Sequence, residues 1–230
     1  MRPLIIRAYQ LQSFQLAGGP NWLDSEHFDL TAKAEGEVTA EQINVMLQSL
    51  LADRFKLVVH HETRQLPAFH LTKARSDGKL GPALKPAAVD CGPTGRGRTD
   101  PAPTGPRVLP VMPASVAKGV VTGCRQLRTP GWLMVAGQPM TVVAAMLTLQ
   151  LGQSVIDRTG LTGNFDFSVS YMPEDRSRPA GPLPEGFPPI NPDAPSLFTA
   201  LREQLGLKLD PQRAPVDVLV IDQVEHPTEN

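Results

Sequence analysis

The sequence predicts an α+β protein of repeated αββ units, with helices packed on mainly antiparallel sheets in two pseudo-repeated lobes. Three observations predict this fold. Several stretches carry one apolar stripe at helical spacing, and such a stripe must be buried against another element. Each stretch precedes two β-rich runs, and many of the second runs alternate apolar and polar residues, as FDLTAK and FDFSVS do. The order of helix, strand, turn and strand recurs four times in 230 residues.

The first unit fits the pattern loosely. PLIIRAYQL predicts a helix, SFQLAG and HFDLTAK predict strands, and GPNWLDSE lies between them. The chain opens on this helix as if a leader and a first strand were missing, so we expect an N-terminally truncated protein. A missing first strand would leave an open sheet edge that can accept a peptide by strand addition.

The second unit contains the clearest helix, at residues 39–55. Thr39 is a good N-cap, and Gln42 three residues later completes a capping box. The helix carries one continuous apolar stripe, which consists of Ile43, Met46, Leu47, Leu50 and Leu51. FKLVVHHET and AFHLTKA follow as predicted strands, and RQLP between them predicts a turn.

The third unit begins with a predicted helix, MTVVAAMLTLQLG, for which Thr141 is a possible N-cap and Gly152 a C-terminal stop. QSVID and NFDFSVSY predict two strands, and RTGLTG between them predicts a hairpin connection. In the fourth unit, PSLFTALREQLG predicts the helix. LKLD and PVDVLVIDQV predict its strands around the turn PQRA.

The expected domain organisation follows from these units. Residues 1–75 form an N-terminal lobe of two αββ units, and residues 132–230 form a C-terminal lobe of two more. Residues 76–131 form a Gly- and Pro-rich insertion without periodicity, which is typical of a linker or a binding loop. A Pro-rich loop at 172–195 separates the third unit from the fourth, and we expect it to be extended and exposed.

Composition limits the classes of partner. The formal net charge is -1, so no strong field attracts nucleic acid, and we expect none as a partner. No window approaches 18 uninterrupted apolar residues, so the chain is not expected to span a membrane. No basic segment followed by an apolar one marks a signal peptide in this chain.

The sequence has two cysteines, Cys91 and Cys124, near the two ends of the predicted insertion. A pair this far apart fits no zinc signature, which needs four ligands at short spacings. It also lacks the Cys-x-x-Cys spacing of a redox motif. Two free thiols or one structural disulfide remain, and export would favour the disulfide.

Four polar residues are candidates for chemistry. His60 and Glu62 lie on one face of a predicted strand, whereas His61 points to the other, and two ligands do not make a closed metal site. Asp157 and Arg158 lie in a turn with two glycines that lacks the spacing of a phosphate loop, so this stretch is interpreted as structural. The sequence predicts no catalytic residue, no metal site and no cofactor.

Long stretches of the chain resemble a known family. AYQLQSFQLAGGPNWLDSEHFDLTAKAEG, MLQSLLADRFKLVVHHETRQLPAFHLTKA and VIDRTGLTGNFDFSVSYMPED are similar to an uncharacterised soil-associated protein family of Acidobacteria. The resemblance implies an exported protein, periplasmic or secreted, whose domain is sometimes fused to an antibiotic-sensor-like metallopeptidase. Members often have cysteines in the central insertion, which agrees with a bridge between Cys91 and Cys124. No activity is established for the family, so it supplies no catalytic residue.

Together these observations favour a non-catalytic extracytoplasmic binding or protein-interaction module with an unknown protein or peptide partner. The alternative is a hydrolase, or the regulatory domain of a peptidase-linked cell-envelope sensor. A cleft in which His60, Glu62, Asp157 and Arg158 converge would favour the alternative.

Overall fold

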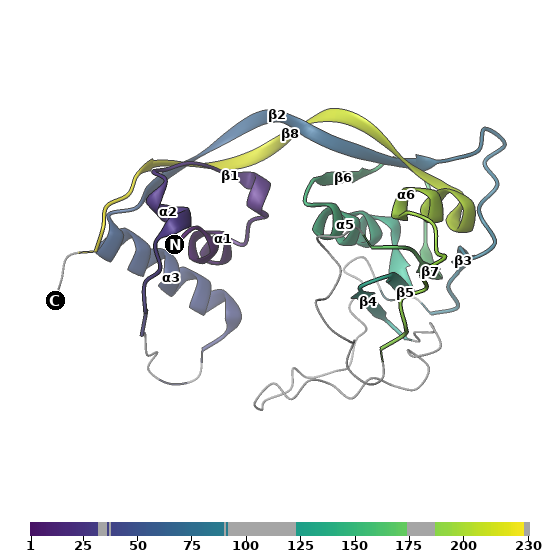
Figure 1. Cartoon of the computed structure of the whole chain (residues 1–230), viewed down its shortest axis with the longest axis horizontal. Coiled ribbons are helices and arrows are strands. Elements are labelled where there is room, and N and C mark those ends of the chain that lie inside the picture. Colours follow the sequence, from purple (N-terminus) through teal and green to yellow (C-terminus); the bar gives the residue numbers. More distant parts are fainter. Residues whose placement is uncertain (32–35, 37, 90, 92–122, 174–186, 228–230) are drawn as a thin grey trace. The chain divides into compact units, whose positions relative to one another are not determined.

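The computed structural model describes residues 1–31, 36, 38–89, 91, 123–173 and 187–227 (Figure 1). It contains helices and both parallel and antiparallel strand pairs, so the predicted α+β class is confirmed. The helices are α1 (Arg2–Ala8), α2 (Trp22–Ser25), α3 (Ala40–Phe55), α5 (Met140–Leu151) and α6 (Leu197–Ala200), with a 3-10 turn at Ser13–Gln15 and a π-helical turn at Leu201–Leu205. The strands are β1 (Leu16–Gly18), β2 (Val58–Lys73), β3 (Lys85–Pro86), β4 (Arg125–Thr129), β5 (Trp132–Pro139), β6 (Ser154–Asp157), β7 (Asn164–Ser170) and β8 (Leu207–Gln223).

The chain divides into two compact units. Unit 1 combines residues 1–67 with residues 213–230, and unit 2 is the continuous segment 68–212. The chain therefore passes from one unit to the other within β2 and again within β8. No helix among the described residues is long and apolar enough to cross a membrane.

Unit 1 is a small sheet covered by helices. β1 pairs in parallel with the end of β8, where Leu16 lies opposite Leu219, and β8 neighbours β2. Figure 1 shows α1, α2 and α3 on one side of these strands. The core of unit 1 is formed by buried side chains of the helices, β1, β8 and the residue before β2, namely Ile5, Ala8, Leu16, Leu23, Leu51, Phe55, Leu57, Leu219 and Ile221.

Helix α3 forms as the sequence predicts. The Thr39 hydroxyl accepts a hydrogen bond from the Gln42 N–H at 3.3 Å, and the Gln42 side chain accepts one from the Thr39 N–H at 2.7 Å. The predicted capping box is therefore confirmed. The helix ends at Lys56, which adopts the left-handed conformation with φ of 49°.

Unit 2 is built around a four-stranded antiparallel sheet in the order β3-β7-β5-β4. Within the same unit, β6 pairs in parallel with the second half of β2, at Ala68–Leu71. Helix α5 contacts both β5 and β6, so its buried face fills the space between the two strand groups. Gly152 ends α5 with a positive φ, as predicted, but the N-cap is Pro139, two residues before the expected Thr141.

Two of the expected hairpins are wrong. RQLP is not a turn, because residues 58–73 form the single strand β2, and PQRA is not a turn, because residues 207–223 form the single strand β8. The prolines in these stretches are tolerated because each lies where its strand has no described neighbour on one side. β8 pairs with β1 only at Leu219–Ile221, and β2 pairs with β6 only at Ala68–Leu71.

The hairpin expected from the third unit is also wrong. β6 pairs with β2, whereas β7 pairs with β3 and β5, so the stretch RTGLTG carries the chain from one sheet to the other. In the first unit, α2 lies within the expected loop, and residues 27–31 of the expected strand HFDLTAK are not in a strand. Alternation and turn residues identified the extended segments but not their partners.

The units differ from the expected lobes. Residues 213–230 group with the N-terminal segment and not with residues 132–212, because β8 completes the sheet of unit 1. The two ends of the predicted insertion supply β3 and β4 to the sheet of unit 2. The rest of the insertion, residues 92–122, and residues 174–186 of the Pro-rich loop lie outside the described residues.

Candidate functional site

His60 and Glu62 are exposed residues of β2 in unit 1. The His60 Nδ1 atom lies 2.9 Å from Oδ1 of Asp222, on β8. Glu62 accepts a hydrogen bond from Arg64 at 2.7 Å, and this guanidinium holds the pKa of the Glu62 carboxyl below its usual value. Each of these side chains thus has a partner on the exposed face of the strands.

Asp157 and Arg158 lie at the end of β6 in unit 2. The Asp157 carboxylate accepts hydrogen bonds from the Thr159 N–H at 2.9 Å and from the Thr159 hydroxyl at 2.8 Å, which closes the turn after the strand. The Arg158 backbone N–H donates to the Leu71 carbonyl, and its side chain is exposed. Two of the four candidates, His60 and Glu62, belong to unit 1, and the other two, Asp157 and Arg158, belong to unit 2. No group of three potential metal ligands occurs among the described residues.

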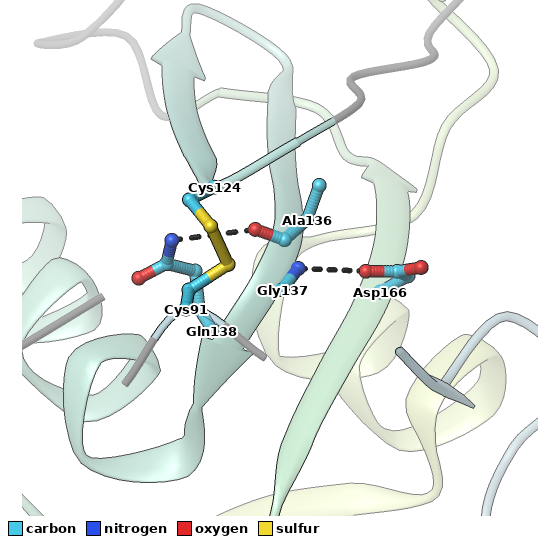
Figure 2. The surroundings of a disulfide bond; sticks show 6 residues. All are labelled: Cys91, Cys124, Ala136, Gly137, Gln138 and Asp166. Carbon is cyan, nitrogen blue, oxygen red and sulfur yellow. Dashed lines mark hydrogen bonds between the residues drawn. A yellow bond between two sulfur atoms is a disulfide. The ribbon is translucent and has the colours of Figure 1, made fainter. Parts of the chain in front are cut away.

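The cysteines form a disulfide in unit 2, as Figure 2 shows. It packs against Gly137 of β5, whose φ is 66° and at which a side chain would collide with the Cys91 sulfur. The Gly137 N–H donates a 2.7 Å hydrogen bond to Asp166 of β7, in a part of β5 where the register with β7 is shifted. The disulfide thus covers an irregular stretch of the central strand pair.

A pocket that the sequence did not predict lies elsewhere in unit 2. It is formed by the turn between β4 and β5, the C-terminal part of α5 and the residue that follows β7. We call it the tyrosine pocket; its volume is about 310 Å³ and its lining is Arg128, Thr129, Pro130, Leu149, Gln150 and Tyr171. The β4–β5 connection is tight because Pro130 and Gly131 form a two-residue turn in which Gly131 has a φ of 84°.

Two residues of the tyrosine pocket have buried hydroxyl groups that find no hydrogen-bond partner among the described residues. Thr129 is 3% exposed and Tyr171 is 2% exposed. Neither hydroxyl oxygen has a partner among the residues that the structure describes. Nearly all buried polar groups in native proteins are hydrogen-bonded, and leaving one unpaired costs about 1–3 kcal/mol. Both oxygens are fully buried, so a molecule in the pocket does not contact them without a movement of the side chains.

The electrostatics of the pocket centre on Tyr171. Burial raises the pKa of its phenol, so the hydroxyl is protonated at neutral pH and can donate a hydrogen bond. The Gly131 N–H and the Arg128 guanidinium act in the opposite direction on this pKa. The Gly131 N–H lies close enough to the phenol to lower its pKa, although the hydroxyl forms no hydrogen bond of ordinary geometry with the described residues.

A second pocket of about 240 Å³ adjoins the first, because Gln150 and Tyr171 line both. We call it the aromatic pocket. Phe69 and Phe198 meet there edge to face, with ring centroids 5.6 Å apart. Leu151, Met172 and Leu197 supply further apolar surface, and Gln153 and Ser196 supply polar groups. Small-molecule sites have volumes of about 300–1,000 Å³, so the tyrosine pocket lies at the lower end of this range.

The pocket of unit 1 offers different chemistry. It has a volume of about 470 Å³ and is lined by α1, α2 and the residues after α2. Its carboxylates are already paired, since Asp24 accepts from Arg2 at 2.8 Å and Glu26 lies 3.1 Å from His226. The described linings of the tyrosine and aromatic pockets contain no carboxylate, and these two pockets are therefore the better candidates.

One sequence signal could have identified Tyr171. The alternation of β7 places Phe165, Phe167 and Val169 on the buried face, and Tyr171 continues the same series. A tyrosine at an inward position brings a polar group into an apolar layer, where it needs a partner. The role of Thr129 carries no comparable signal, because it depends on which elements pack over the turn.

Comparison with known proteins gives one match. The model of a family described as "Protein of unknown function (DUF3738)" matches residues 2–224. No curated protein and no solved structure matches the chain significantly.

Proposed function

The chain belongs to that family of unknown function, and we propose from the geometry of unit 2 that the protein is a non-catalytic binding module. Its ligand site is the tyrosine pocket with the adjoining aromatic pocket. The observation that supports this proposal is the pair of adjoining pockets, which share Gln150 and Tyr171 and carry the edge-to-face contact of Phe69 and Phe198.

The site has the composition of a binding pocket. Both pockets combine apolar side chains with polar ones, and small-ligand sites likewise use a few polar groups to orient a molecule. Leu149 and Phe198 are 51% and 40% exposed at the rim, so apolar surface is available to a bound molecule.

We further propose that the protein works outside the cytoplasm, in the periplasm or as a secreted protein. The Cys91–Cys124 disulfide supports this location, because disulfides persist in oxidising compartments and are rare in the cytosol. Thiol counting under denaturing, non-reducing conditions in protein from its native host tests this part. Two titratable thiols would contradict it.

The binding proposal is tested by NMR titration of the ¹⁵N-labelled protein. The panel contains small carboxylates, phosphates, amines, sugars and neutral apolar compounds. We expect one class to produce saturable shifts of the signals of Thr129, Gln150 and Tyr171, and to be recovered unchanged. Shifts confined to other residues, or none, would contradict the proposal. Turnover of the compound would favour the hydrolase.

A matched pair of variants checks the location of the site. Leu149→Arg places a bulky charge at the rim of the tyrosine pocket, and Val45→Arg makes the same change at an exposed position of α3 in unit 1. Both residues are exposed, so neither change disturbs a core. Binding should be lost in the first variant only.

A further inference from the structure

We propose that the aromatic pocket of unit 2 binds a neutral sugar ring, a pyranose with free hydroxyl groups. The sugar lies against Phe198, and its hydroxyls pair with the side-chain amides of Gln150 and Gln153. This inference rests on the proposed binding function and adds the chemical class of the ligand.

The lining of the aromatic pocket favours an uncharged ligand. No charged side chain occurs among the described residues that line it. An ionised ligand would lose water there without gaining a counter-ion, and burial of an unpaired charge is unfavourable. The adjoining tyrosine pocket contains the Arg128 guanidinium, whose positive charge further disfavours a cation.

Two amide side chains supply polar groups to this pocket. Gln150 lies in the last turn of α5, and Gln153 follows the helix two residues after its end. Neither side chain has a hydrogen-bond partner among the described residues. An amide both donates and accepts hydrogen bonds, and a sugar hydroxyl does the same. Each glutamine can therefore pair with hydroxyl groups in either direction.

The other two polar residues of the pocket are already committed or inaccessible. The Ser196 hydroxyl caps α6, where it accepts from the Thr199 N–H at 3.3 Å and donates to the Thr199 hydroxyl at 3.1 Å. The Tyr171 hydroxyl is fully buried. The two glutamines therefore carry the polar recognition in the described lining.

Phe198 supplies the apolar surface for the sugar. It is 40% exposed, and Phe69 holds its ring edge to face with the centroids 5.6 Å apart. A pyranose presents a face of C–H groups that can cover an aromatic ring while its hydroxyls reach polar partners. Such a contact removes apolar surface from water. A purely apolar ligand would cover the same ring but would take both amides out of water without partners.

The volume of the aromatic pocket limits the size of the ligand. Its volume of about 240 Å³ lies below the range of about 300–1,000 Å³ of small-molecule sites. One ring fits this volume better than a longer compound. We therefore expect a single sugar unit to be bound, either free or as part of a glycan.

The test is an NMR titration of the ¹⁵N-labelled protein, with the side-chain amide signals of Gln150 and Gln153 as the readout. The probes are the methyl glycosides of glucose, galactose and mannose, and we expect at least one of them to give saturable shifts at both amides. Cyclohexanol keeps a six-membered ring without the sugar hydroxyls, and the uronate and 2-amino forms of the best sugar add a charge. Each of these three should bind at least about fivefold more weakly than the best neutral sugar, which corresponds to about 1 kcal/mol. Cellobiose shows whether a sugar unit within a chain supplies the same ring.

Three variants and one control assign the contacts. Gln153→Leu removes the amide and Phe198→Leu removes the aromatic ring, and each should weaken binding of the best sugar about fivefold. Phe198→Trp keeps an aromatic ring and should bind about as tightly as the wild type. Gln126→Leu makes the glutamine change at an exposed position of β4 outside the described lining, and it should alter affinity less than about twofold. All three positions are exposed, so none of these changes disturbs a core.

The outcomes separate this inference from the proposed function. If charged or purely apolar compounds shift Gln150 and Gln153 while neutral sugars do not, the ligand class is wrong and the binding site stands. If no compound class acts at either pocket, both proposals fail. Equal weakening in Gln153→Leu and Gln126→Leu, or equal affinity of Phe198→Leu and Phe198→Trp, would overturn the assignment of the sugar to the aromatic pocket.

Discussion

Tyr171 carries a buried hydroxyl that the ligand-free protein leaves unpaired, and this has a consequence for stability. Tyr171→Phe keeps the ring and removes the oxygen. The free energy of unfolding should rise by about 1 kcal/mol without ligand, because the cost of burying an unpaired hydroxyl disappears. Urea denaturation measures this change. Tyr9→Phe, at the half-buried second tyrosine, is the control and should change stability by less than about 0.5 kcal/mol.

A loss of stability in Tyr171→Phe would contradict this interpretation, because it would mean that the hydroxyl has a favourable partner.

The ionisation of Tyr171 predicts a pH dependence. Burial raises the pKa of its phenol above the usual 10.0, whereas the unfolded chain keeps the usual value. Below pH 10 both states are protonated and the contribution of Tyr171 to stability is constant. Above pH 10 the unfolded state loses the proton first, so the free energy of unfolding falls as the pH rises through the folded-state value.

Urea midpoints at pH 8 and pH 11 test this dependence. The loss of stability between the two values should be smaller in Tyr171→Phe than in the wild type. The pKa of Tyr9 is also raised by burial, so some loss should remain in the variant. Identical losses in both proteins would show that Tyr171 does not ionise differently on unfolding.

At the scale of elements, α3 depends on its N-terminal capping box. Thr39→Ala removes the side-chain acceptor for the Gln42 N–H and should lower the free energy of unfolding by about 1 kcal/mol. Thr39→Ser retains an acceptor and should stay close to the wild type. Denaturation followed by circular dichroism measures both. Equal effects of the two substitutions would mean that the hydroxyl does not cap the helix.

The helices were predictable because their signals are local. The capping box of α3 and the left-handed Gly152 after α5 act within one turn of chain, so the sequence contains them completely. Strand pairing is not local. β6 resembles half of a hairpin with β7, yet it pairs with β2, more than 80 residues earlier, and only packing around α5 decides this.

The turns predicted at the prolines of β2 and β8 were wrong for a related reason. Pro67 and Pro211 lack an N–H, which makes them turn signals in isolation. A strand tolerates proline where that side of the backbone has no neighbour. Whether a strand has such an open side depends on the whole sheet, so the sequence of the strand alone could not decide it.

The candidate site could not be predicted from the sequence, and the physical reason is the same. His60, Glu62, Asp157 and Arg158 were conspicuous because polar residues gather locally, and the first three have side-chain partners nearby. Thr129 and Tyr171 are 42 residues apart in sequence and line one pocket only because β5 pairs with both β4 and β7. Recognition of such a pair requires the fold.

At the scale of the whole molecule, the disulfide acts on unit 2. It closes a loop with a sequence separation of 33, for which the chain-entropy model gives a stabilisation of about 3–4 kcal/mol. The double variant Cys91→Ser/Cys124→Ser should therefore unfold at lower urea concentration, with the loss confined to signals of unit 2. A reducing agent should have the same effect on the wild type and none on the variant. An unchanged midpoint would mean that the bond does not restrain unfolding.

Unit 1 is discontinuous in sequence, and we expect its fold to depend on the C-terminal segment of the chain. This unit takes residues 213–230 from the end of the chain, and Leu219 and Ile221 lie in its core beside Leu16 and Leu23. Unit 2 is one continuous segment whose core residues all lie between 68 and 212. A chain that ends at Gln212 should lose the structure of unit 1, because its sheet loses the part of β8 that pairs with β1.

Methyl NMR spectra of the shortened chain test this dependence. Signals of Val143, Leu147 and Val169 in unit 2 should keep their positions, whereas those of Ile5 and Leu51 in unit 1 should collapse to unfolded values. The segment 68–212 alone should fold cooperatively and keep the tyrosine pocket, since all residues that line it lie within this range. Unfolding of both units in the shortened chain would instead mean that unit 2 depends on unit 1, and the binding site could then not be separated from the chain ends.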